Sequence, residues 1–443
     1  MFAFTRPAGR RSGVALALVL ACGTALGTVA LEAPASAQKK KKEEAQAGKP
    51  NYSKGFIAAY RAGEELTKAG NNEGARAQVP TITAAIETDD DRYAAGGFLL
   101  NLGGAVSDPA LQLQGLELML ASGKADPARL GAFNYTAYQL AAQNGDQAKA
   151  RNYLGQAIAV NHSFEGRLTD GTTRSFGVDD MHAMYAETFF EENNHAAGFD
   201  YLRQQIEQRA AAGGAVPQTW ITRPLSVAYN NDMNDHALAF GKLYAEHFPS
   251  ETSWGDAIAI QRNLIDYDAQ LTLDLLRLAK RTSALRDTRA YIDYIEAADA
   301  RRLPGEVKRV IDAGLASGKL TSGDVYVTEA SGIANARIAA DRADLPALER
   351  DAKAAAATAV TATAAGDAFL SYEDYAKAEA MYAIAATKPG VDMGRVMMRL
   401  GIAQVGLGKT AEAIESFGKV DASRKHIADL WTIYAKQQAR PAA

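Results

Sequence analysis

The chain has 443 residues, of which 47% are hydrophobic, and its 48 basic and 52 acidic residues give a formal net charge of −4. This mildly acidic balance provides no broad basic surface and argues against nucleic acid as a partner. The single cysteine, Cys22, excludes an internal disulfide and a cysteine-ligated zinc site.

The first 37 residues have the pattern of a secretory signal peptide. Three arginines precede an apolar segment at 14–21, and small residues follow at 35–37. We therefore expect cleavage between Ala37 and Gln38 and a periplasmic mature protein with no stable membrane span. Processing at Cys22 is a second reading, and it would leave the protein anchored by lipid.

Residues 38–51 are charged and poor in apolar side chains, with four adjacent lysines at 39–42. Such a composition predicts a disordered tether, because it buries too little apolar surface to offset the entropy of ordering. The lysines leave open an association with the cell envelope. Removal of residues 1–37 takes away three arginines and one glutamate, so the mature net charge is −6.

From residue 52 onward, apolar residues recur at helical spacing between turn residues. The first repeats cover 52–160, where Asp108-Pro109 and Asp126-Pro127 have the order of an N-cap followed by a first-turn proline. The expected helix pairs are 53–70 with 74–88, 92–106 with 109–123, 127–143 with 146–160, 178–192 with 195–211, 217–230 with 234–248, 254–265 with 268–283, 286–300 with 304–317, 322–340 with 344–357, 358–371 with 374–387, and 391–406 with 409–419.

A long connection at 161–177 interrupts this pattern before the central repeats at 178–357. Loops of this length are uncommon unless they are functional or disordered. Two readings stay open for it: a plain linker, or a loop that binds a ligand or covers the edge of a helix pair.

The segment 358–420 contains the clearest repeat. Ala378 and Ala413 occupy corresponding positions thirty-five residues apart. A recurrence of this length is typical of stacked helical hairpins, none of which buries its apolar face alone. The first copy contains Gly366, Phe369, Tyr375, Ala378, Tyr382 and Ala385, and the second contains Gly401, Gln404, Gly408, Ala413, Phe417 and Val420.

In this small-and-large pattern the sequence resembles the tetratricopeptide repeat (TPR) family. The resemblance implies an all-α fold, a right-handed superhelix of antiparallel helix pairs, and a non-enzymatic scaffold that binds a protein or peptide in a concave groove. In that family the first helix of each pair lines the groove. Carried over, the groove residues are Arg395, Met398 and Arg399 in the best-matched pair and Thr222, Arg223, Ser226, Tyr229 and Asn230 in the middle of the chain.

The middle set has the better chemistry for a peptide. Arg223 can bind a carboxylate, Tyr229 can stack on a side chain, and Asn230 can pair with peptide backbone. The competing interpretation is that Tyr229 packs in the interior and that Asn230 begins a polar turn. At the end of the chain, 421–443 contains apolar residues at helical spacing, and we expect a capping helix that covers the last repeat.

No catalytic motif, metal site or cofactor is expected. Gly408-Lys409-Thr410 resembles part of a phosphate-binding loop but follows a helix, so we expect a hairpin turn there. His182 and His195 lie among acidic residues without metal-ligand spacing. Two alternative functions stay open: a cell-wall glycan-active enzyme on an α/α toroid, which needs paired carboxylates in a pocket, and a lipid-anchored assembly factor of the outer membrane.

Overall fold

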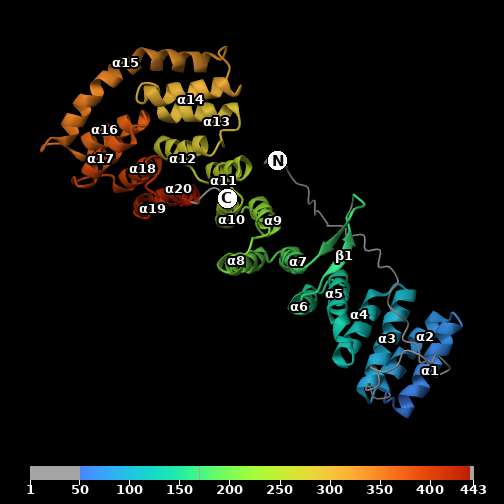
Figure 1. Cartoon of the computed structure of the whole chain (residues 1–443). Coiled ribbons are helices and arrows are strands. Elements are labelled where there is room, and N and C mark those ends of the chain that lie inside the picture. The colour runs from blue at the N-terminus through green and yellow to red at the C-terminus, as the bar shows by residue number, and fades with distance from the viewer. Residues whose placement is uncertain (1–49, 169, 440–443) are drawn as a thin grey trace, which may run out of the picture. The chain divides into compact units, whose positions relative to one another are not determined.

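The computed structural model describes residues 50–168 and 170–439, which are almost entirely helical (Figure 1). They form two compact units, which we call the N-terminal unit and the C-terminal unit, and the chain passes from one to the other between Trp220 and Ile221. The signal peptide, its cleavage between Ala37 and Gln38, and Cys22 lie outside the described residues.

The N-terminal unit consists of helix pairs, and the two helices of each pair pack against each other. Its tightest pair is α3 with α4, where Gly96 and Gly115 face each other. A Cβ added at Gly96 would lie 2.5 Å from the main-chain oxygen of Gly115, so only glycine permits this approach. The helices are α1 (Lys54–Lys68), α2 (Asn72–Ala84), α3 (Asp89–Ala105), α4 (Pro109–Ala121), α5 (Pro127–Gln143), α6 (Gln147–Ala159), α7 (Val178–Glu191) and α8 (His195–Ala211).

The helix starts in this unit follow the caps that the sequence predicts. The carboxylates of Asp108 and Asp126 accept hydrogen bonds from the first turns of α4 and α5, each ahead of a first-turn proline. Thr88 and Asp91 form a reciprocal capping box at the start of α3. Local side-chain chemistry therefore sets where these helices begin.

The connection at 161–177 contains an antiparallel β-hairpin, which the sequence reading did not predict. Its strands, β1 (Phe164–Arg167) and β2 (Thr173–Phe176), pair Phe164 with Phe176. The ring of Phe164 stacks on Tyr135 of α5 with centroids 4.2 Å apart, and on Phe176 with centroids 5.1 Å apart. The aromatic contacts bind the hairpin to α5, so this segment covers helix α5 and is not a plain linker.

The C-terminal unit continues the helix pairs. α9 (Thr219–Asn230) begins two residues before the unit boundary, and the remaining helices follow in order. They are α10 (Asn234–His247), α11 (Glu251–Leu264), α12 (Ala269–Arg281), α13 (Thr288–Ala298), α14 (Pro304–Ala316), α15 (Val325–Lys353), α16 (Ala359–Ser371), α17 (Tyr375–Ala386), α18 (Met393–Gly406), α19 (Thr410–Phe417), the short 3-10 helix η1 (Ala422–Arg424) and α20 (Lys425–Gln438).

The repeat at 358–420 packs as its sequence pattern predicts. Gly366 of α16 lies under the ring of Tyr382, and Gly401 of α18 lies under the ring of Phe417 in the same way. Ala378 and Ala413 are fully buried at the second close approach of each pair. The expectation of an all-α array of antiparallel helix pairs is confirmed, and the pairs have the small-and-large packing of the TPR-like pattern.

One expected pair is a single helix. The sequence reading divided 322–357 into two helices, whereas α15 runs unbroken through Pro346 for 29 residues. A proline inside a helix removes one backbone hydrogen bond, so tertiary contacts are needed to keep this helix continuous. Tyr372, the residue that caps the C-terminus of α16, provides one of them, because its hydroxyl donates to the carboxylate of Asp341 at 2.6 Å. Leu345 and Leu348, on either side of the proline, pack against the core.

Beyond α15 the C-terminal unit folds back on itself, so that α18 and α20 lie beside α12 (Figure 1). The terminal helix α20 covers α19, as expected, but it also packs on α10 and α12. The indole nitrogen of Trp431 donates to the main-chain oxygen of Asp274 at 2.9 Å, and Gln437 donates to that of Ala245 at 2.8 Å. The last helix therefore closes the array onto helices that precede it by more than 150 residues.

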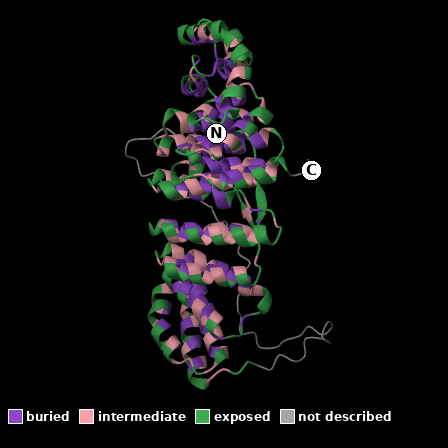
Figure 2. Ribbon diagram, turned by 90° about the vertical axis from the view of Figure 1, so that its left-hand side faces the viewer, coloured by how far each residue is buried: buried purple, intermediate pink, exposed green. Residues whose placement is uncertain are grey.

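Buried residues concentrate on the faces where neighbouring helices meet, and exposed residues cover the outer faces (Figure 2). In the C-terminal unit a single continuous cluster of buried apolar residues extends from Ala245 to Ile433. Among residues 50–168 and 170–439, no helix is both long enough and apolar enough to cross a membrane.

Candidate functional site

A polar cavity of about 650 Å³ opens beside α11 and α13 in the C-terminal unit. Both helices are first members of their pairs, and the loop between α11 and α12 completes the wall. We call this cavity the first-helix groove. Its polar side chains are Arg262, Asn263, Asp266, Tyr267, Thr272, Arg289, Asp293 and Glu296.

The predicted middle set lies next to this groove. Arg223 and Asn230 on α9 are exposed, and Tyr229 is partly exposed. The amide of Asn263 donates to the hydroxyl of Tyr229 at 3.2 Å, which connects α9 directly to the groove wall. Tyr229 is therefore not packed in the interior. Thr222 and Ser226 are also partly exposed on α9.

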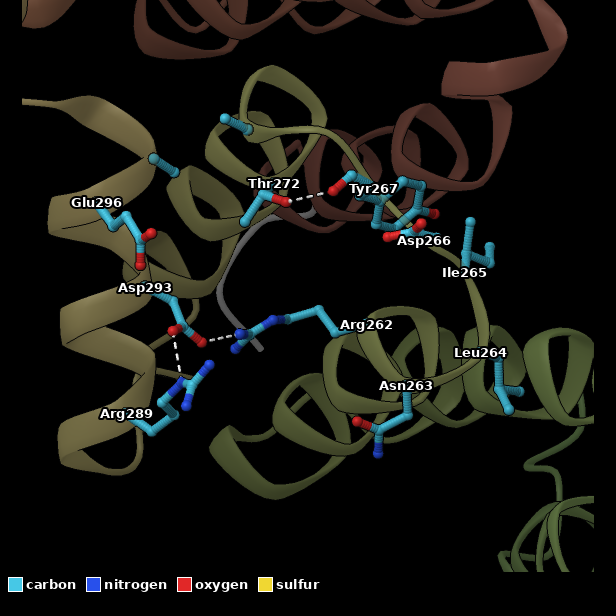
Figure 3. A pocket seen from close by; sticks show the side chains of 12 residues that line it. Arg262, Asn263, Leu264, Ile265, Asp266, Tyr267, Thr272, Arg289, Asp293 and Glu296 are labelled. Carbon is cyan, nitrogen blue, oxygen red and sulfur yellow. Dashed lines mark hydrogen bonds and ion pairs between the residues drawn. The ribbon is translucent and has the colours of Figure 1, made fainter.

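The centre of the groove is an ion trio. The guanidinium groups of Arg262 and Arg289 lie on either side of the Asp293 carboxylate (Figure 3). The Arg289 Nε to Asp293 Oδ1 distance is 2.6 Å, and the Asp293 side chain is only 10% exposed. Arg289 itself is 83% exposed, so most of its guanidinium faces solvent and is accessible to a ligand.

A smaller cavity of about 380 Å³ continues the groove toward the start of α13, sharing Arg262, Asn263, Arg289 and Asp293 with it. At this end the side chain of Arg286 lies across α11. A Cβ on Gly255 would come within 2.5 Å of that guanidinium, so the glycine makes room for it.

The remaining groove side chains are hydrogen-bonding groups. Burial raises the pKa of Tyr267 above its ordinary value, so this phenol stays protonated at neutral pH. Its hydroxyl donates to Gln261 at 3.2 Å, and the hydroxyl of Thr272 donates to the main-chain oxygen of Tyr267 at 3.4 Å. Amides and hydroxyls of this kind pair with peptide backbone, while the exposed Arg289 can bind a carboxylate.

The sequence reading missed Arg262, Asn263, Arg289 and Asp293. A usable signal was present, because the first-helix rule that selected residues of 217–230 applies equally to 254–265 and 286–300. Their spacing is helical, with Arg289 and Asp293 four residues apart on one face of α13.

The second predicted set is not a groove surface. Met398 and Arg399 are fully buried, so the expectation that they line an open groove is wrong. The face of α18 that carries them packs against α12 of the same chain, where Arg399 meets Asp274. Arg395 is partly exposed and lines a separate cavity of about 400 Å³ beside α16.

Arg399 belongs to a buried ionic network between α12, α14, α16 and α18. Its guanidinium contacts Asp274 at 3.1 Å and Asp367 at 2.7 Å, while Arg277 contacts Asp274 at 3.0 Å and Glu306 at 2.7 Å. Each carboxylate therefore has an arginine partner in the interior of the unit.

The arginines decide the protonation of two of these carboxylates. Burial alone raises the pKa of Glu306, but the charge and hydrogen bonds of Arg277 outweigh it and hold the pKa below its ordinary value. Burial likewise raises the pKa of Asp367, and Arg399 and Arg395 reverse that effect. Both groups stay ionised, which is the opposite of what a general acid requires.

The two disfavoured chemical motifs have structural roles. His182 makes a 2.6 Å hydrogen bond to the hydroxyl of Tyr201, and no cluster able to hold a metal ion occurs within the described part of the chain. Gly408 has a φ of 72° in the turn between α18 and α19. A helix and not a strand precedes it, so this segment lacks the strand that a phosphate-binding loop requires.

No family model matches the sequence, and no curated protein sequence matches it. Among solved structures, the chain is similar to the TPR domain of P58(IPK), with 12% identity, coverage of 87% of this chain and 99% of that chain, and a TM-score of 0.19. It is also similar to the APC/C hetero-tetramer Cut9-Hcn1, with 13% identity, coverage of 85% and 66%, and a TM-score of 0.22. Scores this low carry no argument about fold or function.

The class of protein therefore follows from the chain's own packing. Consecutive antiparallel helix pairs, a thirty-five-residue recurrence of small and large residues, and a polar groove on the first helices define an all-α helical-repeat protein with TPR-like pairs.

Proposed function

We propose that the protein is a scaffold or adaptor whose first-helix groove binds an extended segment of a protein partner. The observation that carries this proposal is the Asn263 to Tyr229 hydrogen bond, which joins the exposed face of α9 to the groove wall. The groove wall presents the arginines and amide of α11 and α13, and α9 adjoins it through Tyr229. A preformed surface of this kind binds an extended peptide at low ordering cost.

A glycan-active enzyme is the less favoured function. Such an enzyme needs two carboxylates in an open pocket, one of them held as a general acid. The C-terminal unit folds back on itself as a toroid would, but Asp274, Glu306 and Asp367 at its centre are engaged by arginines. In the first-helix groove, Asp293 is held by two further arginines, but Asp266 and Glu296 also line it, so lack of activity on peptidoglycan fragments is the measurement that would exclude this function.

The proposed location of the scaffold rests on the sequence alone. The signal-peptide pattern of residues 1–37 supports export to the periplasm. Mass measurement of the mature N-terminus tests this: a chain that begins at Gln38 supports export without an anchor. An acylated Cys22 would instead support the lipid-anchored alternative, and an unprocessed chain would contradict export.

The groove assignment is tested by site-specific crosslinking in intact cells. A photoreactive residue in place of Asn263 should capture a discrete partner protein, whereas one in place of Lys419, an exposed residue just after α19, should not. The captured segment is then synthesised and its affinity for the purified full chain is measured.

A matched pair of variants completes the test. Arg289 and Lys308 each form an ion pair with an aspartate four residues later, but only Arg289 lines the groove. Arg289→Ala should weaken binding of the synthetic segment about tenfold. This corresponds to about 1.4 kcal/mol, a typical loss when an arginine at the centre of an interface is truncated. Lys308→Ala should leave it unchanged. Equal affinities for both variants and the parent would refute the groove as the binding surface.

A further inference from the structure

A separate cavity of about 270 Å³ lies in the C-terminal unit between α12, α14, α16, α17 and α18. It shares no lining residue with the first-helix groove. Four basic side chains line it: Arg277, Lys280 and Arg281 from α12 and Arg309 from α14. These helices come together only because the chain folds back after α15, so the cavity is a product of that closure.

The charges in this cavity do not balance. Arg277 and Glu306 also line it, but they satisfy each other through two hydrogen bonds of 2.8 and 2.7 Å. Glu373 is then the only lining carboxylate that faces Lys280, Arg281 and Arg309 among the described residues. The cavity therefore carries two positive charges in excess.

Glu373 compensates its neighbours weakly. It lies 3.4 Å from the Lys280 ammonium and 3.5 Å from the Nε of Arg309. That Nε is buried and has no hydrogen-bond partner in the described structure. The two terminal nitrogens of Arg309 donate to the main-chain oxygens of Gly305 and Ser371, so Arg309 contributes its positive charge to the cavity, while Lys280 and Arg281 offer the donors.

Arg281 is positioned without a carboxylate. Its guanidinium donates to the hydroxyl of Tyr375 at 2.8 Å and lies 5.2 Å from the centroid of that ring and 5.9 Å from that of Trp431. The two rings fix its direction while leaving guanidinium donors unused. A planar fork held in this way is suited to bidentate contact with a carboxylate or phosphate.

We propose that this cavity is an oxyanion-binding site, which takes a carboxylate or phosphate group between Lys280, Arg281 and Arg309. Its volume admits an acidic side chain of a protein partner as well as a free small anion. Lys280 is 30% exposed and Glu373 45% exposed, so solvent reaches the site from the side where these two residues lie. The site does not depend on the peptide groove.

Two variants with opposite expected signs test the proposal. Lys280→Gln removes a binding charge and should weaken the affinity for the anion about five- to tenfold. This is the lower end of the range for a charge-assisted hydrogen bond, because Lys280 is partly exposed. Glu373→Gln removes the competing carboxylate and should increase the affinity for the anion by a similar factor. Both side chains are partly exposed, so neither change is expected to unfold the unit.

The measurement is calorimetric titration of the full chain with inorganic phosphate, and separately with free glutamate and with a short oligoglutamate peptide, in phosphate-free buffer at low salt. Lys419→Gln, a change at an exposed residue just after α19, serves as the control and should match the parent.

Saturable binding that weakens in Lys280→Gln and tightens in Glu373→Gln supports the site. Preference for the oligoglutamate over free glutamate assigns the oxyanion to a partner's acidic side chain, and preference for phosphate assigns it to a free anion. No saturable binding to any of the three probes, or binding that both variants leave unchanged, would overturn the proposal.

Discussion

The buried arginine that joins α18 to α12 gives the sharpest stability prediction. Arg399→Met keeps much of the side-chain volume and removes the charge that contacts Asp274 and Asp367. Arg399 is fully buried, so no water replaces the lost guanidinium. We expect this substitution to destabilise the C-terminal unit selectively, because Arg399 connects helices on both sides of its fold-back.

The magnitude follows from the charges in the network. Before the change, three carboxylates face three arginines, so the interior is neutral. Afterwards one carboxylate charge has no counterpart, and breaking a buried pair from one side costs about 3–5 kcal/mol. The network consists of Asp274, Glu306 and Asp367 with Arg277, Arg395 and Arg399.

The assay is urea unfolding followed by tryptophan fluorescence in a Trp220→Phe background, which leaves Trp254 and Trp431 in the C-terminal unit as reporters. The indole of Trp431 donates to the main-chain oxygen of Asp274 in α12 at 2.9 Å, so its emission reports the closure. Lys419→Met, which removes an exposed ion pair, is the control and should leave the transition unchanged.

The pH dependence provides a second readout. In the parent, the lowered pKa of Asp367 means that its contribution to stability is complete above the unfolded pKa of about 3.9 and is lost as the pH falls through that value toward the folded pKa. In Arg399→Met, a buried carboxylate without its partner has a raised pKa, so protonation relieves the unpaired charge. The difference in free energy of unfolding between variant and parent should therefore become smaller as the pH is lowered from 7.5 to 5. A destabilisation below about 1 kcal/mol, or one independent of pH, would refute the reasoning.

Three further predictions concern packing and protonation. Gly401→Ala should destabilise the protein by about 1–2 kcal/mol, because overpacking against the buried Phe417 ring exceeds the gain in helix propensity. Gly332→Ala in α15, where a Cβ meets nothing within 4 Å, should stabilise it by about 0.5–1 kcal/mol. The urea unfolding midpoints of the two variants should therefore shift in opposite directions from that of the parent. Burial lowers the pKa of His162, so this histidine binds a proton more readily in the unfolded chain than in the folded one. The N-terminal unit should therefore lose stability as the pH falls below about 6.5. His162→Gln should reduce this loss, which thermal melts at pH 7.5 and 5.5 measure. Trp431→Phe removes the indole donor to α12 and should destabilise the C-terminal unit by about 1–3 kcal/mol, detected by hydrogen exchange in α12 and α20; unchanged exchange would contradict the closure.

Local sequence chemistry determined the helix pairs and many of their ends. Capping carboxylates, first-turn prolines and turn glycines act over a few residues, so Asp108, Asp126 and Gly408 mark boundaries that the structure confirms. The recurrence of Ala378 at Ala413 likewise predicted two buried close approaches correctly. The hairpin at 164–176 was missed because its stability comes from stacking on Tyr135, outside the segment.

The tertiary structure alone decided which helix faces are open. By sequence, α9 and α18 are equivalent first helices, yet the groove residues of α9 reach solvent while Met398 and Arg399 of α18 are buried. The difference arises because α15 continues through Pro346 and the chain then folds back onto α12. Arg399 and Asp274 lie 125 residues apart, and no pattern of period 3.6 or thirty-five reports a contact at that separation. Periodicity fixes what each helix can bury, and long-range packing fixes what it does bury.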